Sequence, residues 1–246
     1  MLEGWSEVDK DLAELNGDVA AFRLSEDQAF ISAMGIQFCS TFFYGNTGLN
    51  PEQFTGMAPR YSSTTAGNGA NVLLAGGAGA DNSSIWLIGW GEQTVHGIYP
   101  KGSVAGLQHE DLGLQTIQGA LGIAGSRLRA YQSRFQWKCG IALRDWRYAV
   151  RIANIDISNL VGKSSAADLP ELMIKAIHRI PSLQGVKPVF YMNRSCYEML
   201  DIQRRDDVQV GGQLSYSNVD GIPNMAFRGI PVHQTDALLE SESVVS

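Results

Sequence analysis

The sequence predicts an α+β fold in which a long helix packs on an elongated antiparallel β-ribbon and a smaller α/β unit follows. Between residues 131 and 158, apolar side chains alternate with polar ones, which is the pattern of half-buried strands. Apolar residues recur at helical spacing between residues 26 and 44, as they do in a helix that lies on a sheet. After residue 154, short helical and strand patterns alternate, which indicates an α/β unit.

The β-ribbon has two alternating runs. The first has apolar residues at every second position: Phe135, Trp137, Cys139, Ile141 and Leu143. A polar turn candidate at Arg144 separates it from a second run that ends near Ile152, so the two runs are expected to pair antiparallel. Because two strands are not stable alone in water, their apolar face requires a cover.

The predicted helix supplies this cover. The segment from Ser25 to Gln28 has the form of a capping box, so a helix of about four turns is expected to start near Glu26. Gly45 is expected to end it. An asparagine and a proline at positions 50 and 51 predict the start of a second, shorter helix.

The segments on either side of this helix are less regular. Residues 1–20 are polar and weakly patterned. Residues 62–84 are rich in serine, threonine, glycine, alanine and asparagine, which predicts a loop. Residues 85–99 contain apolar and aromatic side chains and are interrupted by Gly89 and Gly91, so a broken pair of strands is expected there.

The second half of the chain alternates helices and strands. Asp168, followed two residues later by proline, predicts the start of a helix. Residues 186–192 predict a short buried strand, and Asn193 is expected to cap the next helix. A flexible, polar span over residues 204–223 precedes a last strand at residues 230–232, and the ordered pattern is expected to end near residue 236.

Composition bounds the class of protein. The chain has 246 residues, a net charge of −6 and 44% hydrophobic residues, which is typical of a globular protein and does not favour nucleic acid as a partner held by bulk charge. No apolar run is long enough to span a membrane, and the N-terminus is too acidic for a signal peptide. The three cysteines, Cys39, Cys139 and Cys196, are far apart, so we expect buried thiols rather than disulfides or a zinc site.

Two enzyme-like patterns are weak. The glycine-rich segment from Gly67 to Asp81 lacks the third glycine and the following helix of a dinucleotide site, so a loop is favoured over a phosphate site. Cys196 and His178 both sit in helical patterns with apolar neighbours, and two packing residues are favoured over a catalytic pair.

Clustered acidic residues do not predict chemistry either. His109, Glu110 and Asp111 are adjacent in sequence, so their side chains do not converge on a metal ion. Glu240 and Glu242 lie in a polar tail where nothing is expected to raise a carboxyl pKa. No catalytic, metal-binding or cofactor-binding residue is therefore expected.

The ribbon carries a concentration of basic residues. Three readings stay open for this strip: a solvated face, a nucleic-acid surface, or half of a charged interface between subunits. In the last case the acidic partners would include Glu110 and Asp111. The candidate intersubunit contacts are Arg134, Lys138, Arg144, Arg147, Arg151, Glu110 and Asp111.

Five long segments carry a more specific pattern. They are SEDQAFISAMGIQFCSTFFYGN, WLIGWGEQTVHGIYPKGSVAGLQHEDLG, FQWKCGIALRDWRYAVRIANIDIS, VFYMNRSCYEML and FRGIPVHQTDALLESESVV. In this order, and over nearly the whole chain, they resemble a branch of the major capsid proteins of tailed bacteriophages. The resemblance implies the Hong Kong 97-type capsid fold, with a spine helix packed on an elongated β-ribbon in a peripheral domain and an axial domain of helices around a small sheet.

The resemblance also implies a division of the chain. Residues 1–157 are expected to hold the spine helix and the peripheral strands, 158–223 the axial domain, and 224–246 a strand that returns toward the peripheral sheet and a C-terminal tail. Family members usually carry an N-terminal arm and an extended hairpin loop ahead of the spine. Since this chain is expected to begin essentially at the spine, those parts either lie upstream of Met1 or are reduced.

The function implied is structural and non-enzymatic. Copies of the chain are expected to form hexamers and pentamers of an icosahedral shell around double-stranded DNA, assembled in the host cytoplasm and found in the virion. Scaffolding, portal or decoration proteins are further expected partners, DNA is expected to be contacted non-specifically, and no membrane or cofactor is expected. Two alternatives stay open: an encapsulin-like nanocompartment shell of the same fold, and a nucleotide-binding enzyme that uses residues 67–81.

Overall fold

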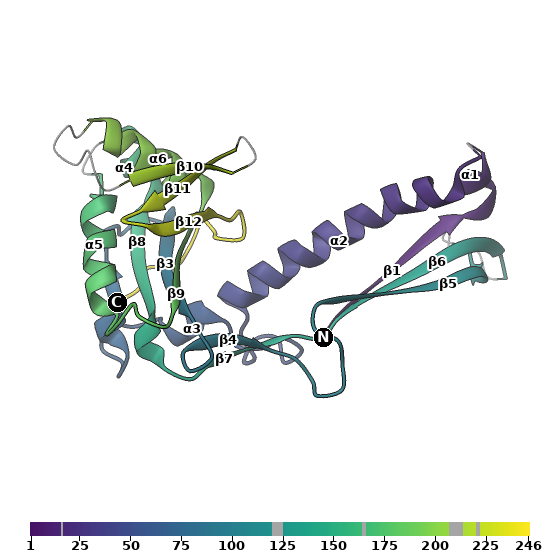
Figure 1. The fold of residues 1–246 in the computed structure, drawn as a ribbon, viewed down its shortest axis with the longest axis horizontal. Helices are drawn as coiled ribbons and strands as arrows, with labels where there is room; N and C mark the ends of the chain where they lie inside the picture. Colours follow the sequence, from purple (N-terminus) through teal and green to yellow (C-terminus); the bar gives the residue numbers. More distant parts are fainter. Residues whose placement is uncertain (16, 120–124, 164–165, 207–213, 220–221) are drawn as a thin grey trace.

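The protein is elongated and contains two separate β-sheets joined by a long helix. A computed structural model describes residues 1–15, 17–119, 125–163, 166–206, 214–219 and 222–246. Helix α2 (Val19–Tyr44) extends from the compact part of the molecule over a narrow ribbon of three strands (Figure 1). The compact part contains a nine-stranded sheet and the remaining larger helices.

The elements follow one another along the chain as strands interspersed with short helices. The strands are β1 (Leu2–Asp9), β2 (Val72–Leu74), β3 (Asn82–Trp90), β4 (Val95–Ile98), β5 (Leu107–Gln118), β6 (Arg127–Trp137), β7 (Gly140–Leu143), β8 (Ala149–Asp156), β9 (Lys187–Met192), β10 (Leu214–Val219), β11 (Ile222–Phe227) and β12 (Ile230–Gln234). The other helices are α1 (Lys10–Glu14), α3 (Met57–Arg60), α4 (Ile157–Gly162), α5 (Leu169–Arg179) and α6 (Arg194–Asp206), with 3-10 turns at Gly69–Asn71 and Trp146–Tyr148.

The ribbon is an antiparallel sheet in the order β1-β6-β5, and α2 packs along one face of it. Near the centre of the helix, Met34 lies over Gly4 of β1, where the absence of a side chain permits close approach. Toward its end, the ring of Phe38 stacks on Trp137 of β6 with centroids 4.7 Å apart. These contacts confirm the predicted helix on an antiparallel β-ribbon.

The helix is longer than the sequence pattern indicated. It begins after Asp18, whose Oδ1 accepts a hydrogen bond from the backbone N of Ala21 at 3.0 Å. The expected start near Glu26 is therefore wrong, because an earlier cap and a run of helix-forming residues precede Ser25. The end at Gly45 is confirmed.

Two predictions about the segments next to α2 are wrong. The chain does not begin essentially at the helix, since β1 and α1 precede it and β1 pairs with β6 over its whole length. The second helix does not start at residue 50, where the chain only makes turns; a single helical turn, α3, follows at Met57. One backbone hydrogen bond, from Gln53 to Asn50, closes the turn that the asparagine and proline favour.

The expected pairing between the two runs of the ribbon is also wrong. Strand β6 pairs with β1 and β5, whereas β8 belongs to the other sheet and pairs with β3 and β2. Strand β8 is buried on both faces along almost its whole length, as expected for a central strand covered on two sides. The alternation of Arg147 and Arg151 suggested a solvated face, but Arg147 precedes β8 and Arg151 is only 4% exposed.

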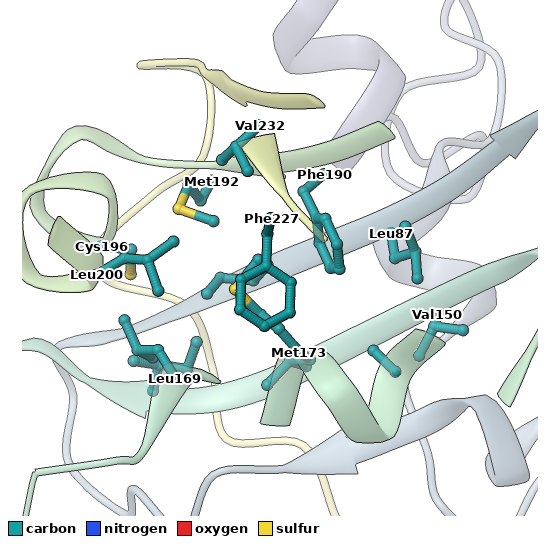
Figure 2. Close-up of a cluster of buried hydrophobic side chains, with 14 of the residues drawn as sticks. Leu87, Val150, Leu169, Met173, Phe190, Met192, Cys196, Leu200, Phe227 and Val232 are labelled. Carbon is teal, nitrogen blue, oxygen red and sulfur yellow. The ribbon is translucent and has the colours of Figure 1, made fainter. Parts of the chain in front are cut away.

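The nine-stranded sheet has a hydrophobic core on each face, because side chains of β3 and β8 alternate between them. One core contains Leu87 and Val150 from these strands, Met173 from α5 and Leu200 from α6, and Figure 2 shows these apolar side chains converging around Phe227. The other core contains Trp86 and Ile88 of β3, the end of α2, α3 and part of the C-terminal tail. The sheet is thus the middle layer of the compact part.

Local signals in the second half of the chain are confirmed. Asp168 caps α5, and its Oδ1 accepts from the backbone N of Glu171 at 2.9 Å; Asn193 Oδ1 likewise accepts from the backbone N of Cys196 at 2.8 Å. Strand β9 forms where expected, but only Phe190 and Met192 on it are buried. In the expected flexible span, residues 207–213 and 220–221 lie outside the described residues, while β10 occupies 214–219 and pairs with β11.

The last strand does not return to the ribbon. Strand β12 pairs in parallel with β9 and antiparallel with β11, so it completes the nine-stranded sheet. Because this sheet also contains β3 and β4, which the resemblance assigns to the peripheral domain, the expected return of the last strand toward the peripheral sheet stays a prediction. The division of the chain at residues 157/158 and 223/224 stays a prediction; β3 is hydrogen-bonded both to β8, before this division, and to β9, after it.

Candidate assembly surfaces

The outer face of the ribbon, which points away from α2, holds a charged cluster around Arg134. Across the three strands, Trp5, Arg134 and Glu110 are direct neighbours. Arg134 Nε lies 3.0 Å from Glu3 Oε1, Arg134 Nη1 lies 3.4 Å from Glu110 Oε2, and its guanidinium lies over the Trp5 ring. These contacts lower the pKa of Glu3, chiefly through the hydrogen bond from Arg134. The charge of Arg134 is therefore compensated within the chain.

The inner face of the ribbon has a second polar cluster, which fixes α2 in register with the sheet. Arg23 on α2 binds Asp111 of β5, with Nη2 and Oδ1 2.6 Å apart, and also donates to Ser133 of β6. Ser133 in turn donates to Asp27, a buried carboxylate on the next turn of α2. Asp111 occupies this face because it lies directly opposite Ser133 in the regular register of β5 and β6; a β-bulge follows it.

The ion pair between Arg23 and Asp111 predicts a pH-dependent contribution to stability. The Arg23 hydrogen bond holds the pKa of Asp111 below its usual value of 3.8, so the contribution is present above that value and is lost as pH falls through the lower pKa of the folded state. Because Asp111 is largely exposed, Asp111→Asn is expected to cost under about 1 kcal/mol at pH 7. Urea denaturation from pH 7 to pH 3 should show this difference shrinking; a constant difference would contradict the prediction.

The other predicted contact residues do not form one continuous surface. Arg147 is paired with Asp145 two residues away, with Nη2 and Oδ2 2.7 Å apart. Arg144 donates to the Gln93 side chain and, like Lys138, has no ion-pair partner within the part of the chain that the structure describes. Arg151 is buried in the compact part. Arg151 is thus unsuited to contact another subunit, whereas Arg144 and Lys138 are open to one.

Sequence patterns missed an exposed apolar surface on α2. Only a few side chains of α2 are buried, because the ribbon beneath it is narrow. Apolar residues occur on all sides of α2. A helix of this kind is normally buried on all sides, so this arrangement of apolar residues was the signal in the sequence that α2 has contacts beyond the ribbon. The exposed apolar side chains on α2 are Leu24, Phe30, Ile31 and Ile36, of which Ile36 is 67% exposed.

The C-terminal tail was also misjudged. Glu242 is buried, and its carboxylate lies 2.9 Å from Arg151 Nη2 while accepting hydrogen bonds from Ser84 and Tyr44. Regular secondary structure does end near residue 236, as expected, because β12 ends at Gln234, but the tail that follows is partly buried rather than solvated. Its polar composition resembled a solvated tail because the buried cation that binds Glu242 lies 91 residues earlier in the chain.

The enzyme-like patterns do not form sites. The segment from Gly67 forms a 3-10 turn and β2. A Cβ at Gly69 would lie 1.9 Å from the carbonyl oxygen of Thr64, so Gly69 allows the backbone of Thr64 to pack closely against it. Cys196 is fully buried, and burial raises the pKa of its thiol to about 12, whereas His178 is exposed. Cys139 is half-buried, and Cys39, expected to be buried, is exposed because it lies on a free side of α2.

The described residues hold neither a metal-binding cluster nor a membrane-spanning helix. They contain no group of three or more histidine, cysteine or acidic side chains placed to hold a metal ion. None of their helices combines the length and the apolar character that crossing a bilayer requires.

Comparison with known proteins places these surfaces in context. The family model for major capsid protein GP7 matches residues 1–246. A chain in a near-atomic-resolution structure of bacteriophage Epsilon15 is 31% identical with a TM-score of 0.71, and the match covers 99% of this chain and 73% of that chain. The comparison with curated protein sequences finds no match.

A helix on an extended ribbon, joined to a compact α/β part, is the Hong Kong 97-type capsid fold, and the protein is a structural shell protein of a tailed bacteriophage. The chain belongs to the family of major capsid protein GP7. Its family implies assembly with copies of itself and a location in the virion. The resemblance of the five sequence segments to phage capsid proteins is thereby confirmed.

Proposed function

We propose that copies of this chain form hexamers and pentamers of an icosahedral shell around double-stranded DNA, and that the free sides of α2 are contacts between neighbouring copies. The observation that carries the second part is the exposure of Leu24, Ile31 and Ile36 on a helix covered by a three-stranded ribbon on one side only. Exposed apolar surface of this kind is typical of protein contact sites. Many such contacts repeated over a closed shell give large stability even when each is modest.

Charged residues add specificity to the proposed contacts. Arg144 is exposed, Lys138 is half-buried, and neither forms an ion pair among the described residues. Opposite charges on a neighbouring copy, such as Glu110 or Asp111 at the edge strand β5, would favour the correct register over others. Since Glu110 and Asp111 already bind Arg134 and Arg23 within the chain, contact with another copy would extend these networks.

The proposed role is mechanical and involves no catalysis. The negative net charge suits an inner surface that binds DNA weakly and without sequence preference. Assembly in the host cytoplasm, with scaffolding, portal or decoration proteins as partners, belongs to the same proposal. Electron microscopy of the purified protein tests it, because closed shells or capsomer rings are expected, and a monodisperse monomer at all concentrations would contradict it.

A surface variant tests the contact assigned to α2. Ile36→Lys is expected to leave the free energy of unfolding of the single chain within about 0.5 kcal/mol, because the side chain is mostly in solvent. Assembly, measured by sedimentation, is expected to weaken at least about tenfold, since a charge would be buried in the contact. The matched control is Gln28→Lys, an exposed polar position on the same helix. If Ile36→Lys assembled as well as the wild type, this face of α2 would not be a contact between copies.

A further inference from the structure

The last residues of the chain form a connector between parts that are distant in sequence. Residues 235–246 have no helix or strand, yet Leu238, Glu242 and Val245 are buried. Figure 1 shows this C-terminal segment running back along the compact part after β12. A polar segment without regular structure is normally solvated, so its burial requires specific partners.

Those partners belong to three elements. At the end of α2, the Tyr44 hydroxyl accepts from the backbone N of Leu239 at 2.9 Å and donates to the Glu242 carboxylate. On β3, the backbone N of Glu242 donates to the carbonyl of Asn82 at 2.9 Å, and the Ser84 hydroxyl donates to its carboxylate. Glu242 therefore binds the last residue of α2 and the central strand of the sheet at the same time.

Strand β8 provides the third attachment. Arg151 Nη2 pairs with Glu242 Oε2 at 2.9 Å, and Arg151 also donates to the carbonyl of Tyr61, just after α3. Three residues further along β8, Asn154 holds Val245 with two hydrogen bonds, of 2.8 and 2.9 Å, to its backbone O and N. The side chains of Arg151 and Glu242 are 5% and 4% exposed, so each depends on the other for compensation of its charge.

We propose that residues 235–246 are a strap whose docking fixes the end of α2 to the nine-stranded sheet and so sets the direction in which α2 and the ribbon project from the compact part. The last turn of α2 is held to this sheet by its own aromatic residues, Phe42 and Phe43, and by the strap. Aromatic packing is non-directional, whereas the hydrogen bonds of Tyr44 and Glu242 fix an orientation. In a shell, this direction decides which neighbour the ribbon reaches; that consequence rests on the proposed function, but the strap itself does not.

Hydrogen–deuterium exchange on the full-length, unassembled chain tests the proposal. Glu242→Gln keeps the size of the side chain but removes the partner of Arg151, and Tyr44→Phe removes only the hydroxyl. In both variants, exchange is expected to rise about tenfold or more in residues 235–246 and, together with it, in residues 39–44. The matched control is Asp236→Asn, which removes the strap's exposed ion pair with Arg194 and is expected to leave residues 39–44 unchanged.

The outcomes separate clearly. A rise confined to residues 235–246 in both variants, with residues 39–44 as protected as in wild type, would overturn the strap. If Glu242→Gln unfolds the whole chain, Tyr44→Phe decides by the same comparison. Electron microscopy of the wild type judges shell formation separately, so loss of the proposed function and loss of the strap give different results.

Discussion

Replacing Arg151 with methionine is expected to lower the free energy of unfolding by roughly 3–5 kcal/mol, because the carboxylate of Glu242 would stay buried without its cation. The guanidinium also fills space above the Trp86 ring, 5.4 Å from its centroid, and donates to backbone carbonyl groups that would lose their partner. Equilibrium denaturation in urea measures the loss. The effect is expected to be among the largest of any single substitution in the chain.

A double variant separates the charge from the packing. Arg151→Met with Glu242→Leu removes both ions, so the penalty for an unpaired buried charge disappears. The double variant is expected to be more stable than Arg151→Met alone. If Arg151→Met cost under about 1 kcal/mol, or if the second substitution only added to the loss, the buried pair would not have the role assigned to it.

Replacing Phe190 with alanine is expected to cost about 3–5 kcal/mol, because it removes a fully buried ring and leaves a cavity. Phe190 lies on β9, beside Leu87 of β3, and meets the ring of Phe227 edge to face at 6.0 Å. The side chain packs between β3, β9 and β11 in the core that α5 and α6 cover (Figure 2). Thermal or chemical denaturation measures the change.

The same substitution on α2 provides a matched comparison. Phe30 is 37% exposed on the free side of the helix, so Phe30→Ala is expected to cost less than half as much as Phe190→Ala in the unassembled chain. Equal losses at the two positions would mean that α2 is buried to the same extent as the core. The comparison therefore tests the exposure of α2 as well as the core.

Signals that act over a few residues were read correctly from the sequence. The caps at Asp168 and Asn193 and the end of α2 at Gly45 depend on hydrogen bonds or backbone geometry within one turn. The fold class was likewise correct, both from the alternation of patterns and from the resemblance of long segments to a capsid family. Cap strength alone did not place the start of α2, because Asp18 and Ser25 are both acceptable caps.

Strand partners could not be read in this way. Alternation in residues 147–152 indicates a strand but contains no information about which strand lies beside it. Arg151 looked like part of a solvated face, because nothing near it in sequence indicates that Glu242 compensates its charge. For the same reason the sequence could not show that the candidate contact residues, which follow one another along the chain, are divided between two sheets; their role in contacts between subunits stays a prediction.

The composition of the two sheets has a consequence for synthesis on the ribosome. The ribbon and α2 are built only from residues up to Trp137, whereas the nine-stranded sheet needs β9 beside β3 and then β12 beside β9. When residue 137 has been made, an emerging chain has all the residues of the ribbon and α2. Its compact part still lacks strands β7 to β12. In an emerging chain, the apolar surface of α2 is therefore exposed before the compact part can close, and contact between nascent chains through this surface would compete with folding.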